Sequence, residues 1–135
     1  TRNIASGTTE TVTQNTVVSN PHLWNGRPDP YLYKVVTEIE VGGVVVDTVR
    51  QPLGFRYVSV DPDNGFFLNG QYLDLHGVAL HEDRIDKGRA ISDADREQDM
   101  ALMLEMGCNW MRPSHYQHAE TFYDLADEYG VILSS

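Results

Sequence analysis

The chain changes character near residue 74, and this change limits the fold more than any other feature of the sequence. Before residue 74, β-branched runs alternate with turns rich in glycine, proline and asparagine, as in antiparallel sheets. After it, short apolar runs alternate with two amphipathic segments, each followed by a glycine. This alternation predicts a parallel sheet or barrel. Residues 75–135 are too few to close a (β/α)₈ barrel, which takes about 250 residues.

The first half carries local hairpin signals. Residues 31–41 show the partial alternation of a half-buried strand, residues 42–43 are a Gly-Gly turn, and residues 44–49 run back. Asn69-Gly70 predicts a second, shorter hairpin. Together with the β-branched run over residues 11–18, these signals predict the end of an antiparallel β-sandwich.

The second half carries helix boundaries. Ser92 and Asp95 have the spacing of a capping box, and Gly107 and Gly130 stand where glycines close helices. Apolar runs at the start, middle and end of this half predict three short strands, over residues 75–80, 108–111 and 131–133. The expected order is therefore strand, helix, strand, helix, strand.

Composition excludes several classes of protein. The 135 residues carry a net charge of −10, which repels phosphate backbones and argues against a nucleic-acid partner. No apolar stretch approaches the roughly 20 residues of a membrane span, and residues 1–10 lack a signal-peptide core. The single Cys108 excludes an internal disulfide and is compatible with cytosol or periplasm, so the compartment stays open.

Polar side chains follow the first two predicted strands of the second half. His81 comes directly after the first strand, and Arg112 and His115 follow the second. Because parallel strands end at the same edge of a sheet, these three side chains are expected to share a pocket rim suited to a polyhydroxylated or anionic small molecule. The alternative is a purely structural strand end, with Arg112 paired to Glu82 or Asp83.

Other chemistries fit the residues less well. Four of the five histidines follow residue 74, but their spacing does not match a metal site, so no metal is expected. Ser114 lacks the G-x-S-x-G context of a hydrolase nucleophile. Trp24, between loop prolines, is either an interface plug or a stacking platform for sugars.

Several motifs run in order along the chain. They are P-H-L-W (21–24) with P-Y-L-Y (30–33), G-F-R (54–56), F-L-N-G (67–70), G-V-A-L-H-E-D (77–83), N-W-M-R-P-S-H-Y (109–116) and F-Y-D-L-A-D-E-Y-G (122–130). Together they resemble glycoside hydrolase family 2, the β-galactosidase and β-glucuronidase family. The stretches H-E-D-R (81–84) and H-Y-Q-H (115–118) lean toward the β-galactosidase branch.

The resemblance implies an immunoglobulin-like sandwich followed by a (β/α)₈ catalytic barrel. On this basis residues 1–62 are the C-terminal part of the sandwich, 63–74 a connecting hairpin, and 75–135 the N-terminal part of the barrel. The expected fold class is an α+β fragment: the end of an antiparallel sandwich and the first βαβαβ part of a TIM barrel.

The resemblance also implies the function. The family hydrolyses β-linked sugars with retention, using an acid/base and a nucleophilic glutamate. Both have their counterparts beyond residue 135, so no catalytic residue is expected here and the chain alone is expected to be inactive. His81, Arg112 and His115 are implied to line the sugar pocket or to orient those carboxylates. Any cation of the family would be bound downstream, so no cofactor is expected in this chain.

Two further expectations concern partners. Unpaired strand edges and apolar helix faces in an incomplete barrel predict self-association. The alternative function is a non-catalytic carbohydrate-binding or interaction module, which would use Trp24 or exposed tyrosines as stacking surfaces.

Overall fold

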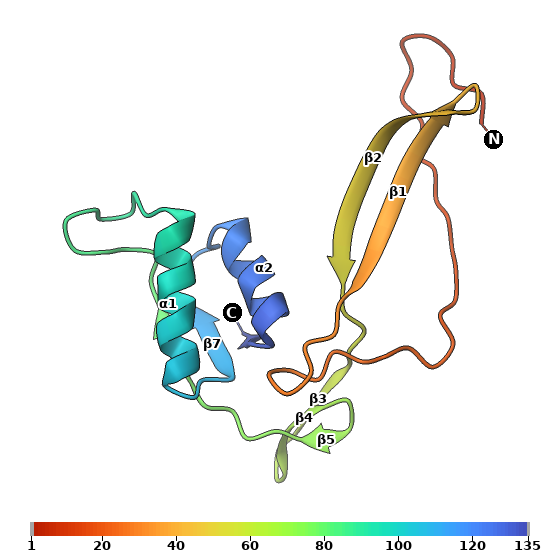
Figure 1. The fold of residues 1–135 in the computed structure, drawn as a ribbon. Helices are drawn as coiled ribbons and strands as arrows, with labels where there is room; N and C mark the ends of the chain where they lie inside the picture. Colours follow the sequence, from red (N-terminus) through yellow and green to blue (C-terminus); the bar gives the residue numbers. More distant parts are fainter. Residues whose placement is uncertain (1, 135) are drawn as a thin grey trace.

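In the computed structural model, which describes residues 2–134, a long β-hairpin projects away from an α/β unit, and a small sheet lies between them along the chain (Figure 1). The hairpin consists of β1 (Tyr33–Val41) and β2 (Val44–Leu53). The small sheet consists of β3 (Val58–Asp61), β4 (Gly65–Leu68) and β5 (Gln71–Tyr72). The α/β unit consists of β6 (Gly77–Leu80), α1 (Asp93–Glu105), β7 (Trp110–Pro113), α2 (Glu120–Tyr129) and β8 (Ile132–Leu133).

The turn of the long hairpin confirms the sequence prediction. Val41 pairs with Val44, so Gly42 and Gly43 form a two-residue loop, and their φ angles of 61° and 84° are both positive. Positive φ at both central positions is the requirement of a type I′ turn, and glycine meets it at no steric cost. The turn sets the register for Val41 and Glu40 only, because a bulge shifts the pairing of β1 with β2 between Ile39 and Glu40.

The expected sandwich is not complete among the described residues. Nearly all side chains of β1 and β2 are exposed, on both faces of the hairpin, and no sheet of the described chain covers either face. The prediction of β structure over residues 11–18 is wrong for this structure, since that stretch forms no strand. A β-branched run becomes a strand only when a neighbouring strand pairs with its backbone, and none lies beside it here.

The small sheet contains the shorter predicted hairpin. β3, β4 and β5 pair in that order, all antiparallel. Asn69 and Gly70, with φ angles of 52° and 78°, make the turn between β4 and β5. Leu68 at the end of β4 is buried in a cluster with Trp24 and Ile132, so this sheet is joined to the α/β unit by apolar contacts.

The α/β unit has the predicted order and strand direction. β6, β7 and β8 are parallel neighbours in chain order. Ser92 caps α1 through the predicted capping box with Asp95, and Gly107 and Gly130 follow the two helices with φ angles of 82° and 77°. The described unit is an open, three-stranded parallel sheet with two helices.

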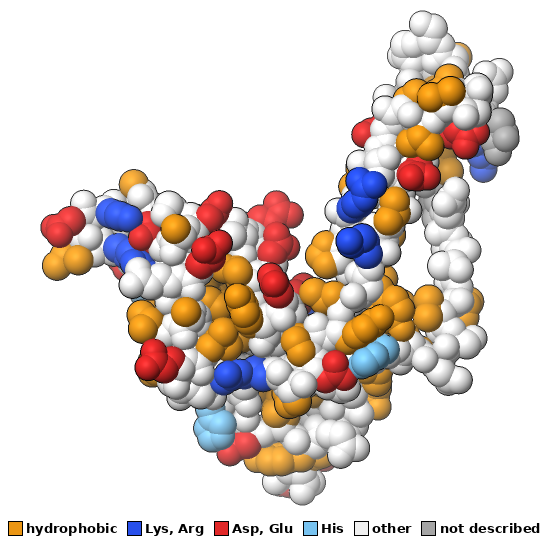
Figure 2. Space-filling model, viewed as in Figure 1, with side chains coloured by type: hydrophobic (Ala, Val, Ile, Leu, Met, Phe, Trp, Pro, Cys, Tyr) orange, Lys and Arg blue, Asp and Glu red, His pale blue; other side chains and the backbone are white. Residues whose placement is uncertain are grey.

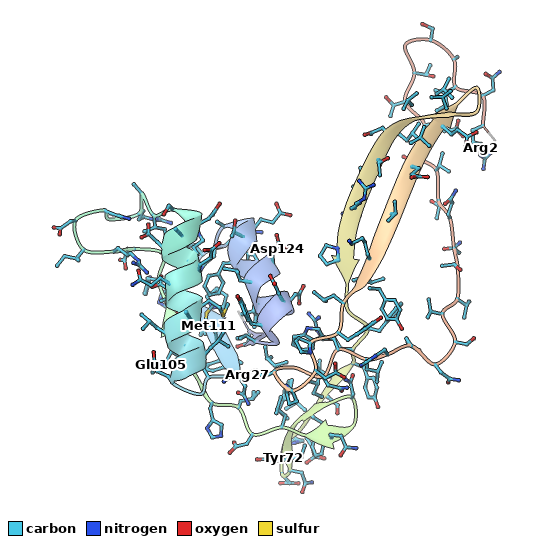
Figure 3. The ribbon with its side chains drawn as sticks, viewed as in Figure 1. Arg2, Arg27, Tyr72, Glu105, Met111 and Asp124 are labelled. Carbon is cyan, nitrogen blue, oxygen red and sulfur yellow. The ribbon has the colours of Figure 1, made fainter. Side chains whose placement is uncertain are left out.

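The core of this unit lies between the helices and the sheet. Met111 of β7 is fully buried and sits between the two helices and the sheet, as the labelled side chain in Figure 3 indicates. The buried members of this cluster are Met100, Met103, Cys108, Met111, Phe122, Leu125, Ala126 and Val131. The sequence also favours core positions for Met100, Met103 and Met106; Met100 and Met103 are buried, but Met106 is 69% exposed, so that interpretation is wrong for Met106.

A loop of the first half is locked against the α/β unit. The Trp24 indole Nε1 donates a hydrogen bond to the Asp127 carbonyl oxygen at 2.7 Å, and Arg27 Nη1 donates to the Cys108 carbonyl oxygen at 3.1 Å. Gly26 lies against Gly130 so closely that a Cβ on Gly130 would overlap the Gly26 backbone. These contacts fix where the loop meets the end of α2.

Figure 2 shows hydrophobic, acidic and basic side chains on both the projecting hairpin and the α/β unit. Among the described residues, no helix has the length and apolar character needed to cross a membrane.

Candidate active-site rim

The three predicted site residues come together at the carboxyl ends of β6 and β7. Arg112 Nη2 lies 3.1 Å from His115 Nδ1, and because arginine can only donate, this histidine nitrogen accepts. The rings of His81 and His115 are 5.3 Å apart, nearly perpendicular. The rule that parallel strands bring their carboxyl ends to one edge therefore gave the correct geometry.

The ion pair that the structural interpretation assigns to Arg112 is absent from the described chain. Arg112 makes no ion pair with any residue of the described chain, whereas Glu82 is paired with Arg96 at 2.6 Å between Oε1 and Nε. Burial acts to raise the pKa of the Glu82 carboxyl, but hydrogen bonds from Arg96 and the Ala119 backbone outweigh it and lower that pKa overall. Glu82 is thus a stable anion committed to Arg96, which leaves Arg112 free at the rim.

Tyr116 belongs to the same rim and was not predicted. Its ring lies 6.0 Å from that of His81, its hydroxyl accepts a hydrogen bond from the Glu82 backbone N–H at 3.0 Å, and the Arg89 guanidinium lies 4.1 Å above its ring. The signal that could have found it is its position, since it directly follows His115 in the segment after β7.

A cavity of about 760 Å³ runs from this rim to the first half of the chain. Arg112, His115 and Tyr116 line one part, and Arg56 and Asp127 line another. His81 is not among the residues that line it and stands beside its rim. Nothing in the sequence predicts that Arg56 and Asp127, which form an ion pair at 3.2 Å, meet here.

The Trp24 side chain fills the interface between the first half of the chain and the α/β unit. Only 1% of its surface is exposed, and the Arg56 guanidinium covers one face of the ring at 4.6 Å. A stacking platform must present an open ring face to a sugar, so Trp24 cannot serve as one in this structure. The role proposed for it in a carbohydrate-binding module is therefore excluded.

The described residues do not form a metal site. Across residues 2–134, no three histidine, cysteine or acidic side chains converge as the ligands of a metal ion would. The imidazole of His118 is buried among protein groups, with Nε2 3.4 Å from the Ser114 carbonyl oxygen. The rim side chains Arg112, His115 and His81 supply hydrogen-bonding groups and one positive charge.

Two family models match the chain in sequence. Residues 1–56 match the model described as glycosyl hydrolases family 2, and residues 58–134 match the model of the TIM barrel domain of that family. The chain belongs to glycosyl hydrolases family 2. It contains residues of the family's preceding domain followed by the start of the TIM barrel domain, as an α+β chain whose described part has no closed barrel.

Individual relatives carry both names used within the family. A β-glucuronidase from Bacteroides fragilis is 47% identical over 86% of this chain. The β-galactosidase BoGH2A from Bacteroides ovatus is 36% identical over 90% of it. The crystal structure of a β-glucuronidase from Bacteroides uniformis superimposes with a TM-score of 0.80 over 84% of the chain, at 34% identity.

The chain spans a small part of each of these proteins: 17% and 14% of the two curated relatives and 14% of the solved structure. The relatives include glucuronidases and galactosidases, so family membership does not choose between the two sugars.

Proposed function

We propose that this chain is part of a retaining β-glycosidase and forms one side of its sugar pocket. The observation that carries the proposal is the convergence of Arg112, His115 and His81 at the carboxyl ends of β6 and β7, the edge at which barrel enzymes bind their substrates. The rim combines one fixed positive charge with two imidazoles that can donate or accept hydrogen bonds.

The chemistry divides between this chain and the rest of the enzyme. In retaining glycosidases, one carboxylate forms a covalent glycosyl-enzyme intermediate and another acts first as acid and then as base. We assign both to segments outside residues 1–135. The guanidinium of Arg112, which has no acidic partner in the described chain, is then available to orient a carboxylate or to donate to sugar hydroxyls.

The domain assignment follows the same proposal. Residues 1–62 form the C-terminal part of an immunoglobulin-like sandwich, residues 63–74 connect, and residues 75–135 begin the barrel. The exposed faces of β1 and β2 support this assignment, because a hairpin with apolar side chains on both faces needs further strands to bury them.

The first experiment compares the complete protein with residues 1–135 alone. The complete protein is expected to hydrolyse a chromogenic β-galactoside or β-glucuronide, and the isolated chain to show no turnover of either. Hydrolysis above blank by the isolated chain would contradict the assignment of both carboxylates to other segments. Failure of the complete protein on both substrates would contradict the galactosidase or glucuronidase activity itself.

A second experiment tests the rim. Arg112→Ala in the complete protein is expected to lower kcat/KM by roughly 100-fold or more, because a charge-assisted contact in the pocket is lost. Arg50→Ala, in exposed strand β2, is the matched control and should leave kcat/KM unchanged. Equal activities of the two variants would rule out a role for Arg112 in the pocket.

A further inference from the structure

Helix α2 begins without a cap of its own. Its N-cap residue is Ala119, whose side chain cannot accept a hydrogen bond, although the first turn of any helix leaves backbone N–H groups without partners. The Ala119 N–H instead donates to Glu82 Oε1 at 3.2 Å. The carboxylate that accepts from the N-cap N–H of α2 thus comes from the loop after β6, which is distant in sequence.

Glu82 is itself held firmly. Arg96 of α1 donates to the same Oε1 at 2.6 Å, and the two side chains are only 14% and 12% exposed. The Glu82 backbone N–H donates to the Tyr116 hydroxyl at 3.0 Å. One residue therefore connects the loop after β6 to α1, to the segment after β7 and to the start of α2.

The segment that Glu82 contacts is the one that carries the rim. Residues 114–119 join β7 to α2 and include His115. The near end of this segment is tied to β6, because the Ser114 N–H donates to the Leu80 carbonyl oxygen at 2.9 Å. Its far end is tied to Glu82 through Ala119. The position of the His115 ring relative to the His81 ring thus depends on both of these hydrogen bonds.

We propose that Glu82 is a positioning residue: by capping α2 from the neighbouring loop, it fixes the segment between β7 and α2 and so holds His115 beside His81 and Arg112. The proposal rests on the proposed function, since it treats these three side chains as the sugar-binding rim. In this role Glu82 does not contact the substrate; it acts by holding residues 114–119 in place.

The test uses Glu82→Gln in the complete protein, with Asp83→Asn as the matched control. Gln keeps the size of the side chain but removes the charge that Arg96 and the helix terminus require. Asp83 is the adjacent acidic residue and is exposed. Two readouts are compared: hydrogen exchange of the backbone amides, and kcat and KM measured separately.

Glu82→Gln is expected to accelerate amide exchange at least about tenfold in residues 115–122, while the C-terminal half of α1 exchanges as in the wild type. It is expected to lower kcat by roughly 10- to 100-fold with little change in KM, because displacement of the rim mainly harms the transition state. Asp83→Asn should match the wild type in both readouts.

A second variant keeps the proposal testable if Glu82→Gln does not fold. Tyr116→Phe keeps the ring and removes only the hydroxyl that accepts from Glu82, and it is expected to accelerate exchange in residues 115–118. Wild-type exchange in both variants, or acceleration spread evenly over the α/β unit, would overturn the proposal. Because exchange does not require turnover, this result stands apart from the assays of the proposed function.

Discussion

The projecting hairpin and the α/β unit are both ordered, yet they are stabilised differently. In the hairpin, β1 and β2 pair along their length with one bulge between Ile39 and Glu40, while the side chains remain exposed; Val46, for example, is 59% exposed. In the α/β unit, Met111 has no exposed surface and packs among residues from both helices and a neighbouring strand. Backbone pairing can therefore be encoded locally, whereas burial requires segments that are distant in sequence.

The sharpest contrast between the two regions lies in their glycines. A Cβ on Gly77 of β6 would overlap the Trp110 carbonyl oxygen and lie 2.7 Å from Trp110 Cε3, whereas a Cβ on Gly43 of the hairpin turn would meet nothing within 4 Å. Gly77→Ala is expected to destabilise the protein by about 4 kcal/mol or more, because strands β6 and β7 must separate. Gly43→Ala should cost about 1 kcal/mol, for its positive φ alone. Urea unfolding followed by tryptophan fluorescence measures both, and similar costs would contradict the contrast.

Core truncation should give the next largest effect. Met111→Ala is expected to lower the free energy of unfolding by about 2–5 kcal/mol, since it leaves a cavity between the sheet and the helices. Val46→Ala, in the hairpin that is exposed in residues 1–135, should change the free energy of unfolding of this chain alone by less than about 0.5 kcal/mol. The same unfolding experiment tests this pair, and a loss at Val46 as large as that at Met111 would mean that the hairpin is covered in solution.

Acid should weaken the α/β unit through Asp95. Hydrogen bonds from Lys87 and then from Ser92 hold the pKa of this carboxyl far below its ordinary 3.8, although burial acts to raise it. A lowered pKa in the folded state means that the ionised carboxylate stabilises the fold. This contribution is complete above the unfolded pKa and is lost as the pH falls below it.

Asp95→Asn should therefore be less stable than the wild type near neutral pH, and the difference should shrink as the pH falls below 3.8. Asp47→Asn in β2 is the control, because Asp47 pairs with no cation in the described chain and lies in the exposed hairpin. Thermal unfolding at a series of pH values measures both. A stability difference between wild type and Asp95→Asn that stays constant across the acid range would refute the linkage.

The smallest expected effect concerns self-association of residues 1–135. If the exposed hairpin provides the contact, Val46→Lys should weaken association several-fold, because it places a charge on an apolar strand surface. Leu102→Lys, on the exposed side of α1 at 51% exposure, is the matched control and should have no effect. Light scattering over a concentration series tests this pair. A wild-type chain that stays monomeric throughout would disprove the self-association.

The features that the sequence predicted correctly are those with local causes. The Gly-Gly turn, the capping box at Ser92 and the order of the three parallel strands each depend on neighbouring residues or on a general rule of chain direction. The meeting of His81 with His115 followed from that same rule.

The features that the sequence did not predict depend on contacts between segments that are distant along the chain. The Trp24 side chain bonds a residue 103 positions away, and Arg56 reaches Asp127 across 71 positions. Hydrophobic periodicity carries no information about such pairings. The pairing of Glu82 with Arg96 rather than Arg112 was also undecided, because the choice depends on how helix α1 lies over the loop after β6.

The close approach of Gly26 to Gly130 has a practical consequence for anyone who recombines the two regions. Any replacement of either region would have to keep glycine at both positions, because a side chain at Gly130 would overlap the backbone at Gly26. It would also have to keep the Trp24 indole, which is buried beside them and bonds the end of α2.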